Sequence, residues 1–184
     1  MAPLLIPEDP RFTTESEQVV WERLRDSLRP EDTVIANLRL TDSRKDHEAD
    51  LVVVMPDVGV VVVEVKGAGV RIDDGAWTIR RHGKRVPIHP VDQARDTRYA
   101  IRQYVESDRR WANSSRGKVR FAHAVVTPFA DLGLDFDLPD CPRWMIHDKA
   151  DLAVLAERLA HIPLSFENHR RPPSQEDCEV IVDI

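Results

Sequence analysis

The sequence predicts an α/β domain with a mixed central sheet and helices on its faces. Two apolar segments of strand character, 50–55 and 58–65, are joined by residues that include the Pro, Asp and Gly typical of a turn. Two longer segments, 13–30 and 90–107, carry apolar residues at helical spacing. A further apolar segment near 120–127 follows the second helix, so it can join the sheet in parallel through a crossover.

The composition fits one globular domain. The chain has 184 residues, of which 42% are hydrophobic and 32% are charged. Its longest apolar run, Val58 to Val63, is too short to span a bilayer, and no signal peptide opens the chain. Cys141 and Cys178 stand in unrelated contexts, which disfavours a disulfide framework or a zinc site. A reduced cytoplasmic protein is therefore the default expectation.

The first half of the chain is expected to contain an irregular, proline-rich arm, a helix, a strand and a polar turn before the two paired strands. Thr14 or Ser16 can cap the helix, and Pro30 ends it. The expected ranges are 1–14 for the arm, 13–30 for the helix, 33–40 for the strand and 41–48 for the turn.

The second half is expected to begin with short strands separated by Gly-bearing turns, after which Pro90 lies in the first turn of a helix. The later elements are expected at 90–107 (helix), 118–129 and 143–147 (strands), 148–162 and 174–184 (helices). As domains, the expected division is an arm at 1–14, a single domain at 15–162 and a C-terminal extension at 163–184.

Three charged residues stand at the ends of the most apolar strands. Asp50 opens the first strand, and Glu64 and Lys66 close the second. Side chains alternate along a strand, so Glu64 and Lys66 share a face, and the turn allows a register with Asp50 beside Glu64. Two such carboxylates repel each other unless a cation lies between them, and hard oxygen ligands suit Mg²⁺ or Mn²⁺. A lysine beside them offsets their charge and can stabilise charge that develops on a phosphate.

Glu-x-Lys alone is a weak signal, because such pairs are common as surface salt bridges. Here it ends a run of valines, which disfavours an exposed pair. A functional site and a structural salt bridge both remain open interpretations of these residues.

Two helical residues are further candidates. Glu17 precedes Trp21 by one turn and shares a face with Leu24, so it is expected to point toward the sheet. The alternative is that Glu17 only favours the helix dipole. Gln93 lies near the apolar side of its helix, and a partly exposed helical glutamine is an equally good interpretation.

The net charge of −6 argues against a protein that coats nucleic acid, but the basic residues are clustered. One cluster lies at 80–85. The second cluster consists of Arg109, Arg110, Arg116, Lys118 and Arg120. Each cluster is interpreted either as a solvated hairpin or loop, or as a phosphate contact.

These residues resemble the nuclease-related domain, NERD, of the PD-(D/E)xK superfamily, which has the restriction-endonuclease-like fold. The resemblance covers about residues 15 to 106 and includes the sequences EAD, GVVVVEVKG and HPVDQA. It is carried by Glu17, Asp50, Glu64, Lys66 and Gln93. The resemblance implies a metal-dependent nuclease that hydrolyses phosphodiester bonds in DNA.

The resemblance also implies residue roles. Asp50 and Glu64 would hold Mg²⁺ or Mn²⁺, with the backbone carbonyl of Val65 as a further ligand. Lys66 would position or activate the attacking water, whose pKa the metal lowers. Glu17 would be an outer or second-metal ligand.

Gln93 would orient the water or a phosphate. The longer pattern is similar to the N-terminal domain of larger bacterial helicase-like proteins. This implies DNA as a partner, and a helicase-like domain beyond Ile184 in the full-length chain. The alternative hypothesis is a catalytically inactive nuclease-fold module for DNA binding or protein interaction.

Overall fold

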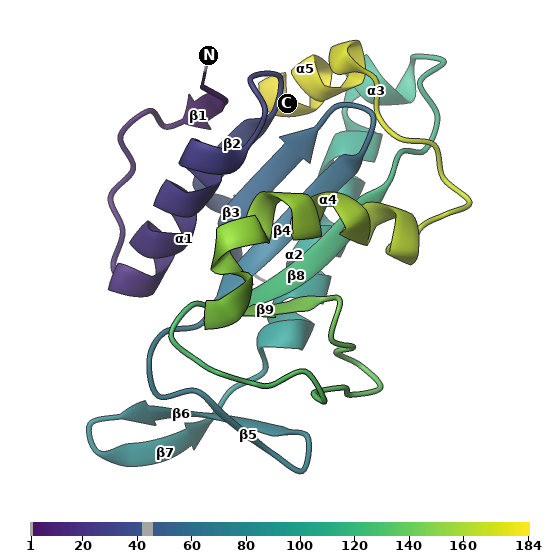
Figure 1. The fold of residues 1–184 in the computed structure, drawn as a ribbon. Helices are drawn as coiled ribbons and strands as arrows, with labels where there is room; N and C mark the ends of the chain where they lie inside the picture. The colour runs from purple at the N-terminus through teal and green to yellow at the C-terminus, as the bar shows by residue number, and fades with distance from the viewer. Residues whose placement is uncertain (1, 42–45) are drawn as a thin grey trace.

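The computed structural model describes residues 2–41 and 46–184 as a mixed α/β fold around a six-stranded sheet (Figure 1). The strand order is β1-β2-β3-β4-β8-β9. β2, β3 and β4 are antiparallel neighbours, whereas β8 pairs in parallel with β4 and with β9, and β1 pairs in parallel with β2. The strands are β1 (Leu4–Ile6), β2 (Thr33–Thr41), β3 (Asp46–Met55), β4 (Gly59–Val65), β8 (Phe121–Thr127) and β9 (Ile146–Asp148).

Helices cover both faces of this sheet, α1 and α4 in front and α2 behind in Figure 1. Leu51 and Val53 of β3 pack in the core under α1 and α4, while Val52 and Val54 pack on the opposite side with α2 and α5. Both faces of β4 and of the inner half of β3, Leu51–Met55, are therefore buried, which explains why these segments are almost continuously apolar. The helices are α1 (Glu15–Ser27), α2 (Pro90–Ser107), α3 (Arg109–Ala112), the 3₁₀ helix η1 (Lys149–Val154), α4 (Leu155–Phe166) and α5 (Gln175–Asp183).

A second sheet of three short antiparallel strands projects from one end of the domain (Figure 1). Its strands are β5 (Arg71–Asp73), β6 (Ala76–Arg81) and β7 (Lys84–Pro87). Two-residue turns join them, with positive φ at Asp74 and Gly75 and again at His82 and Gly83, as in the hairpin turns that suit twisted strands. Trp77 is 7% exposed and anchors the base of this sheet in a core cluster.

The fold class is as predicted, and so are several of its details. The strands between 33 and 65 are antiparallel neighbours, and β8 joins β4 in parallel after α2. The second helix has the predicted bounds, and a final helix is present near the end of the chain. Among the described helices, none has the length and apolar content needed to cross a membrane.

Three local predictions are wrong, and one short helix was not predicted. Leu4–Ile6 is not irregular, because it pairs with β2. Asp46–Glu48 belongs to β3 and not to a turn, while residues 42–45 of that predicted turn lie outside the described residues. The helix predicted at 148–162 begins as a 3₁₀ turn and continues as α4 through Pro163 to Phe166. The sequence interpretation also missed α3.

Candidate active site

The charged cluster lies where β3 and β4 separate. Their ladder ends at the pair Leu51–Val63, and one step further Asp50 falls opposite Glu64. At this point the Val65 amide donates a hydrogen bond to Asp50 Oδ2, with an N–O distance of 2.7 Å. The Asp50 side chain therefore bridges the end of the ladder, and this hydrogen bond fixes the orientation of its carboxylate.

Glu64 and Lys66 form a tight pair beside Asp50. Lys66 Nζ donates to Glu64 Oε1 at 2.5 Å, and the Glu64 residue is only 4% exposed. The Lys66 amide donates to the Val126 carbonyl at 2.9 Å, which extends the β4–β8 pairing by one residue. Lys66 thus has a fixed backbone, and its side chain lies on the same face as Glu64, as strand alternation predicts.

The pKa values of both carboxylates are raised, in each case mainly by burial. The pKa of Asp50 is raised to about 7, mainly by burial and then by the Glu64 charge, and the Val65 amide and Lys66 oppose this rise. Burial also raises the pKa of Glu64, against the charge of Lys66 and its hydrogen bond. A buried site with two carboxylates and one ammonium group is therefore short of positive charge when both acids are ionised.

Glu17 approaches this cluster from the first turn of α1. Its negative charge raises the pKa of both Asp50 and Glu64. Its Oε2 accepts hydrogen bonds from the amide and the hydroxyl of Thr13, with distances of 3.3 and 3.4 Å. A Cβ atom on Gly67 would lie 3.2 Å from Ser16 Oγ, so this turn of α1 packs against the residue that follows Lys66.

No hydrogen bond among the described residues links the Gln93 side chain to Asp50, Glu64 or Lys66. Gln93 lies in the first turn of α2, and its side chain is exposed. Within the described part of the chain, that side chain makes no hydrogen bond. Its amide group faces solvent and is therefore accessible to a bound molecule.

Glu48 is a site neighbour that the sequence interpretation missed. Its negative charge contributes to the raised pKa of Glu64. It lies two residues before Asp50 in β3, so alternation places the two side chains on one face. The two-residue spacing of Glu48 and Asp50 could have predicted this neighbour. The segment 41–48 was interpreted as a turn, however, and strand alternation does not apply to a turn.

The donor set fits a hard divalent cation through two carboxylates. Among residues 2–41 and 46–184, no three His, Cys, Asp or Glu side chains are grouped closely enough to hold a metal ion. Mg²⁺ is nevertheless commonly held by only one or two carboxylates, and it keeps several of its waters. Burial raises the pKa of both Asp50 and Glu64, and nearby acidic charges add to this rise; a bound cation would offset both effects.

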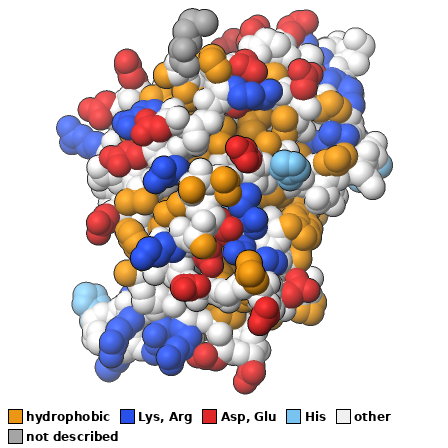
Figure 2. Space-filling view, viewed as in Figure 1, with side chains coloured by type: hydrophobic (Ala, Val, Ile, Leu, Met, Phe, Trp, Pro, Cys, Tyr) orange, Lys and Arg blue, Asp and Glu red, His pale blue; other side chains and the backbone are white. Residues whose placement is uncertain are grey.

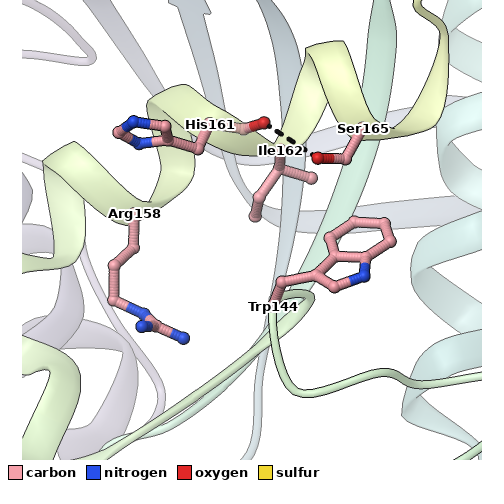
Figure 3. A pocket seen from close by; sticks show the side chains of 5 residues that line it. All are labelled: Trp144, Arg158, His161, Ile162 and Ser165. Atoms are coloured by element: carbon pink, nitrogen blue, oxygen red, sulfur yellow. Dashed lines mark hydrogen bonds between the residues drawn. The ribbon is translucent and has the colours of Figure 1, made fainter.

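A separate pocket of about 170 Å³ lies between α4 and the segment before β9 (Figure 3). None of the candidate residues described above lines it. Arg158 Nε donates to His147 Nδ1 at 3.0 Å and also lies 3.4 Å from Asp151, so this cation is held by the fold. The lining residues are Trp144, Arg158, His161, Ile162 and Ser165.

The mixed sheet flanked by helices is consistent with a nuclease-like fold. The family model of the nuclease-related domain, NERD, matches residues 13–128, from the start of α1 to the end of β8, and the chain belongs to this family. No curated protein and no solved structure matches the chain. The matched region contains all of the candidate residues described above.

Proposed function

We propose that this domain is a nuclease of the PD-(D/E)xK type, which hydrolyses phosphodiester bonds in DNA with Mg²⁺ or Mn²⁺. The observation that carries the proposal is the group of Asp50, Glu64 and Lys66 at the point where β3 and β4 separate. Perturbed carboxylates of this kind concentrate at functional sites. Membership of the nuclease-related family supports a nuclease-related activity.

Each residue has a role that its surroundings support. Asp50, oriented by the Val65 amide, and Glu64 would hold the cation, with the Val65 carbonyl as a further oxygen donor. The ion, when bound, would lower the pKa of the attacking water and neutralise charge that develops on the phosphate. The side chain of Lys66 is 16% exposed, so its ammonium borders solvent and can position a water or a phosphate oxygen.

Glu17 and Gln93 would act at the margin of the site. Glu17 is half-buried and its charge acts on both carboxylates, which suits an outer or second-metal ligand. Gln93 is exposed and would orient a water or a phosphate of the substrate. In the overall reaction, water adds to phosphorus, one P–O bond breaks, and a phosphate monoester and a hydroxyl group are released.

The second candidate function is a catalytically inactive nuclease-fold module that binds DNA or another protein. The observation that favours it is the Glu64–Lys66 ion pair, because a buried pair can be a purely structural element. The two proposals differ in what they require of Lys66: a nuclease needs its ammonium for the reaction, whereas an inactive module needs it only for folding.

A nuclease assay tests the proposal. Wild type and Lys66→Ala are incubated with supercoiled and linear DNA in Mn²⁺, with Lys118→Ala as the control, because Lys118 is exposed. We expect cleavage by wild type and the control, and a loss of about 100-fold or more in Lys66→Ala. Equal cleavage by all three proteins would assign the activity to another site. No cleavage by wild type, in Mn²⁺ or in a parallel incubation with Mg²⁺, would favour the inactive module.

A further inference from the structure

The sheet of β5, β6 and β7, here called the arm (not the N-terminal arm at 1–14), is a basic part of the molecule and adjoins the candidate active site. It leaves the domain a few residues after Lys66 and returns just before α2, which carries Gln93 (Figure 1). Between Arg71 and Pro87 it has five Lys and Arg residues against two Asp, while the whole chain has a net charge of −6. Lys and Arg side chains gather over this end of the molecule in Figure 2.

The β6–β7 hairpin places like charges directly opposite each other. Arg80 pairs in register with Arg85, and Arg81 with Lys84. Like charges at such positions destabilise a hairpin. These side chains are exposed, and Arg80, Arg81 and Lys84 form no ion pair with any described residue. The fold therefore contains a repulsive arrangement that no described carboxylate relieves.

The second basic cluster differs in part, because the fold neutralises two of its five cations internally. Arg110 Nε lies 3.0 Å from Asp108. Arg116 reaches Glu176 at 2.7 Å and Asp177 at 3.2 Å. These guanidinium groups are neutralised within the molecule and tie α3 and α5 to it. Arg109 and Lys118 of this cluster form no ion pair with a described residue, as in the arm, but only in the arm do unpaired cations face each other in register across two strands.

We propose that the arm binds the phosphate backbones of duplex DNA and holds the duplex against the candidate active site, an inference that rests on the proposed function. Strand alternation puts the Arg80–Arg85 pair on one face of the hairpin and the Arg81–Lys84 pair on the other. A groove of DNA has phosphates along both walls, and the major groove admits a two-stranded ribbon. Cations on both faces of a ribbon match that geometry.

The side chains of the arm favour duplex over single-stranded DNA. Modules that bind single strands combine cations with exposed aromatic rings on which bases stack. The one aromatic residue of the arm, Trp77, is buried at its base. The arm therefore offers contacts to phosphates but no stacking platform, and its binding should not depend on the DNA sequence.

Fluorescence anisotropy of a labelled 20-base-pair duplex tests this proposal. Binding is measured in EDTA, so that no hydrolysis occurs, over a series of salt concentrations. The arm variant carries Arg80→Gln, Arg81→Gln and Lys84→Gln. The charge-matched control carries Arg23→Gln, Arg109→Gln and Lys118→Gln at exposed positions outside the arm.

We expect the arm variant to bind at least about tenfold more weakly near 0.1 M salt, with a salt dependence flatter by about 2 to 3 units in log–log slope. The control variant should keep nearly the affinity and the salt dependence of the wild-type protein. Thermal melting should show that the arm variant is folded and no less stable than wild type, because the substitutions relieve repulsion between facing cations.

Equal weakening in both triple variants would overturn the proposal, and so would an absence of duplex binding by wild type. A preference for the single strand of the same sequence would overturn the assignment to duplex DNA. Binding through the arm without any cleavage in Mn²⁺ would remove the proposed function but leave the DNA-binding arm in place. Cleavage by a protein whose binding does not depend on the arm would remove the arm proposal alone.

Discussion

The surroundings of Asp50 disfavour the charged form of its carboxyl group. The pKa of its carboxyl group is about 7 in the folded protein against an ordinary value of 3.8, because of burial and the charge of Glu64. Between these two pH values the folded protein binds more protons than the unfolded chain. The free energy of unfolding of the metal-free protein therefore falls as pH rises from about 4 to about 7.

We accordingly expect Asp50→Asn to stabilise the metal-free protein. Asparagine retains an oxygen that accepts from the Val65 amide but carries no charge. In EDTA at neutral pH, the free energy of unfolding should rise by about 1–3 kcal/mol, and its decline between pH 5 and pH 8 should become shallower. Urea denaturation of both proteins at several pH values measures this. A variant less stable than wild type at neutral pH would indicate that the charge of Asp50 supports the fold.

The positions of the individual site residues could be predicted from the sequence only in part. Alternation and one turn sufficed to bring Glu64 and Lys66 to one face with Asp50 beside them. The hydrogen bond from the Val65 amide was not predictable, because it depends on β3 and β4 separating one residue beyond their last pair. For Gln93 the helix was predicted correctly and the side chain was left open between the apolar side and solvent; the structure shows it exposed, which depends on tertiary packing.

At the scale of elements, the contact between β4 and α4 depends on a glycine at the start of the strand. A Cβ atom at Gly59 would lie 2.6 Å from Pro163 Cβ and 3.1 Å from the Arg120 carbonyl. The proline ring is rigid and lies inside α4. Neither neighbour can move without displacing the helix or the adjacent strand.

Gly59→Ala should therefore destabilise the protein by about 1–3 kcal/mol, the usual cost of overpacking. Chemical denaturation measures the loss, and Gly83→Ala is the comparison, because a Cβ atom at Gly83 meets nothing within 4 Å. Both glycines have positive φ, so the comparison separates crowding from most of the backbone strain. Equal losses in the two variants would show that crowding against Pro163 is not the cause.

The errors in element bounds have a common cause. At the outer end of β3 one face is exposed, at Asp46 and Glu48, yet the strand pairs with β2 through Arg39–Glu48 and Thr41–Asp46, so the ladder continues where the apolar pattern has stopped. A method based on apolar periodicity ends such a strand too early. Leu4–Ile6 was missed for a related reason, since a three-residue edge strand shows no periodicity.

In the whole molecule, the order of elements predicted the mixed character of the central sheet and the pairing of β2, β3, β4 and β8, but not the edge strand β1. A strand that follows a helix returns most simply in parallel, and β8 does so beside β4. The short strands of the arm were anticipated from their turns. Their projection from one end of the domain after β4 was not, because turn chemistry fixes a hairpin locally but not its direction.

The central claim is that Asp50 and Glu64 form a divalent metal site, and thermal melting with and without Mn²⁺ tests it without knowledge of the substrate. A ligand that binds only the folded state stabilises it by mass action. At about 100 times its dissociation constant, Mn²⁺ should raise the melting temperature of wild type by about 5–10 °C.

The same melts are measured for Asp50→Asn, for Glu64→Gln and for Asp26→Asn, a control in which the carboxylate is exposed and paired with Arg25. The account predicts that Asp26→Asn keeps the full metal-dependent rise and that both site variants lose most of it while remaining folded. The contradicting result is a wild type that Mn²⁺ does not stabilise, together with site variants that are less stable than wild type because Lys66 has lost its partners.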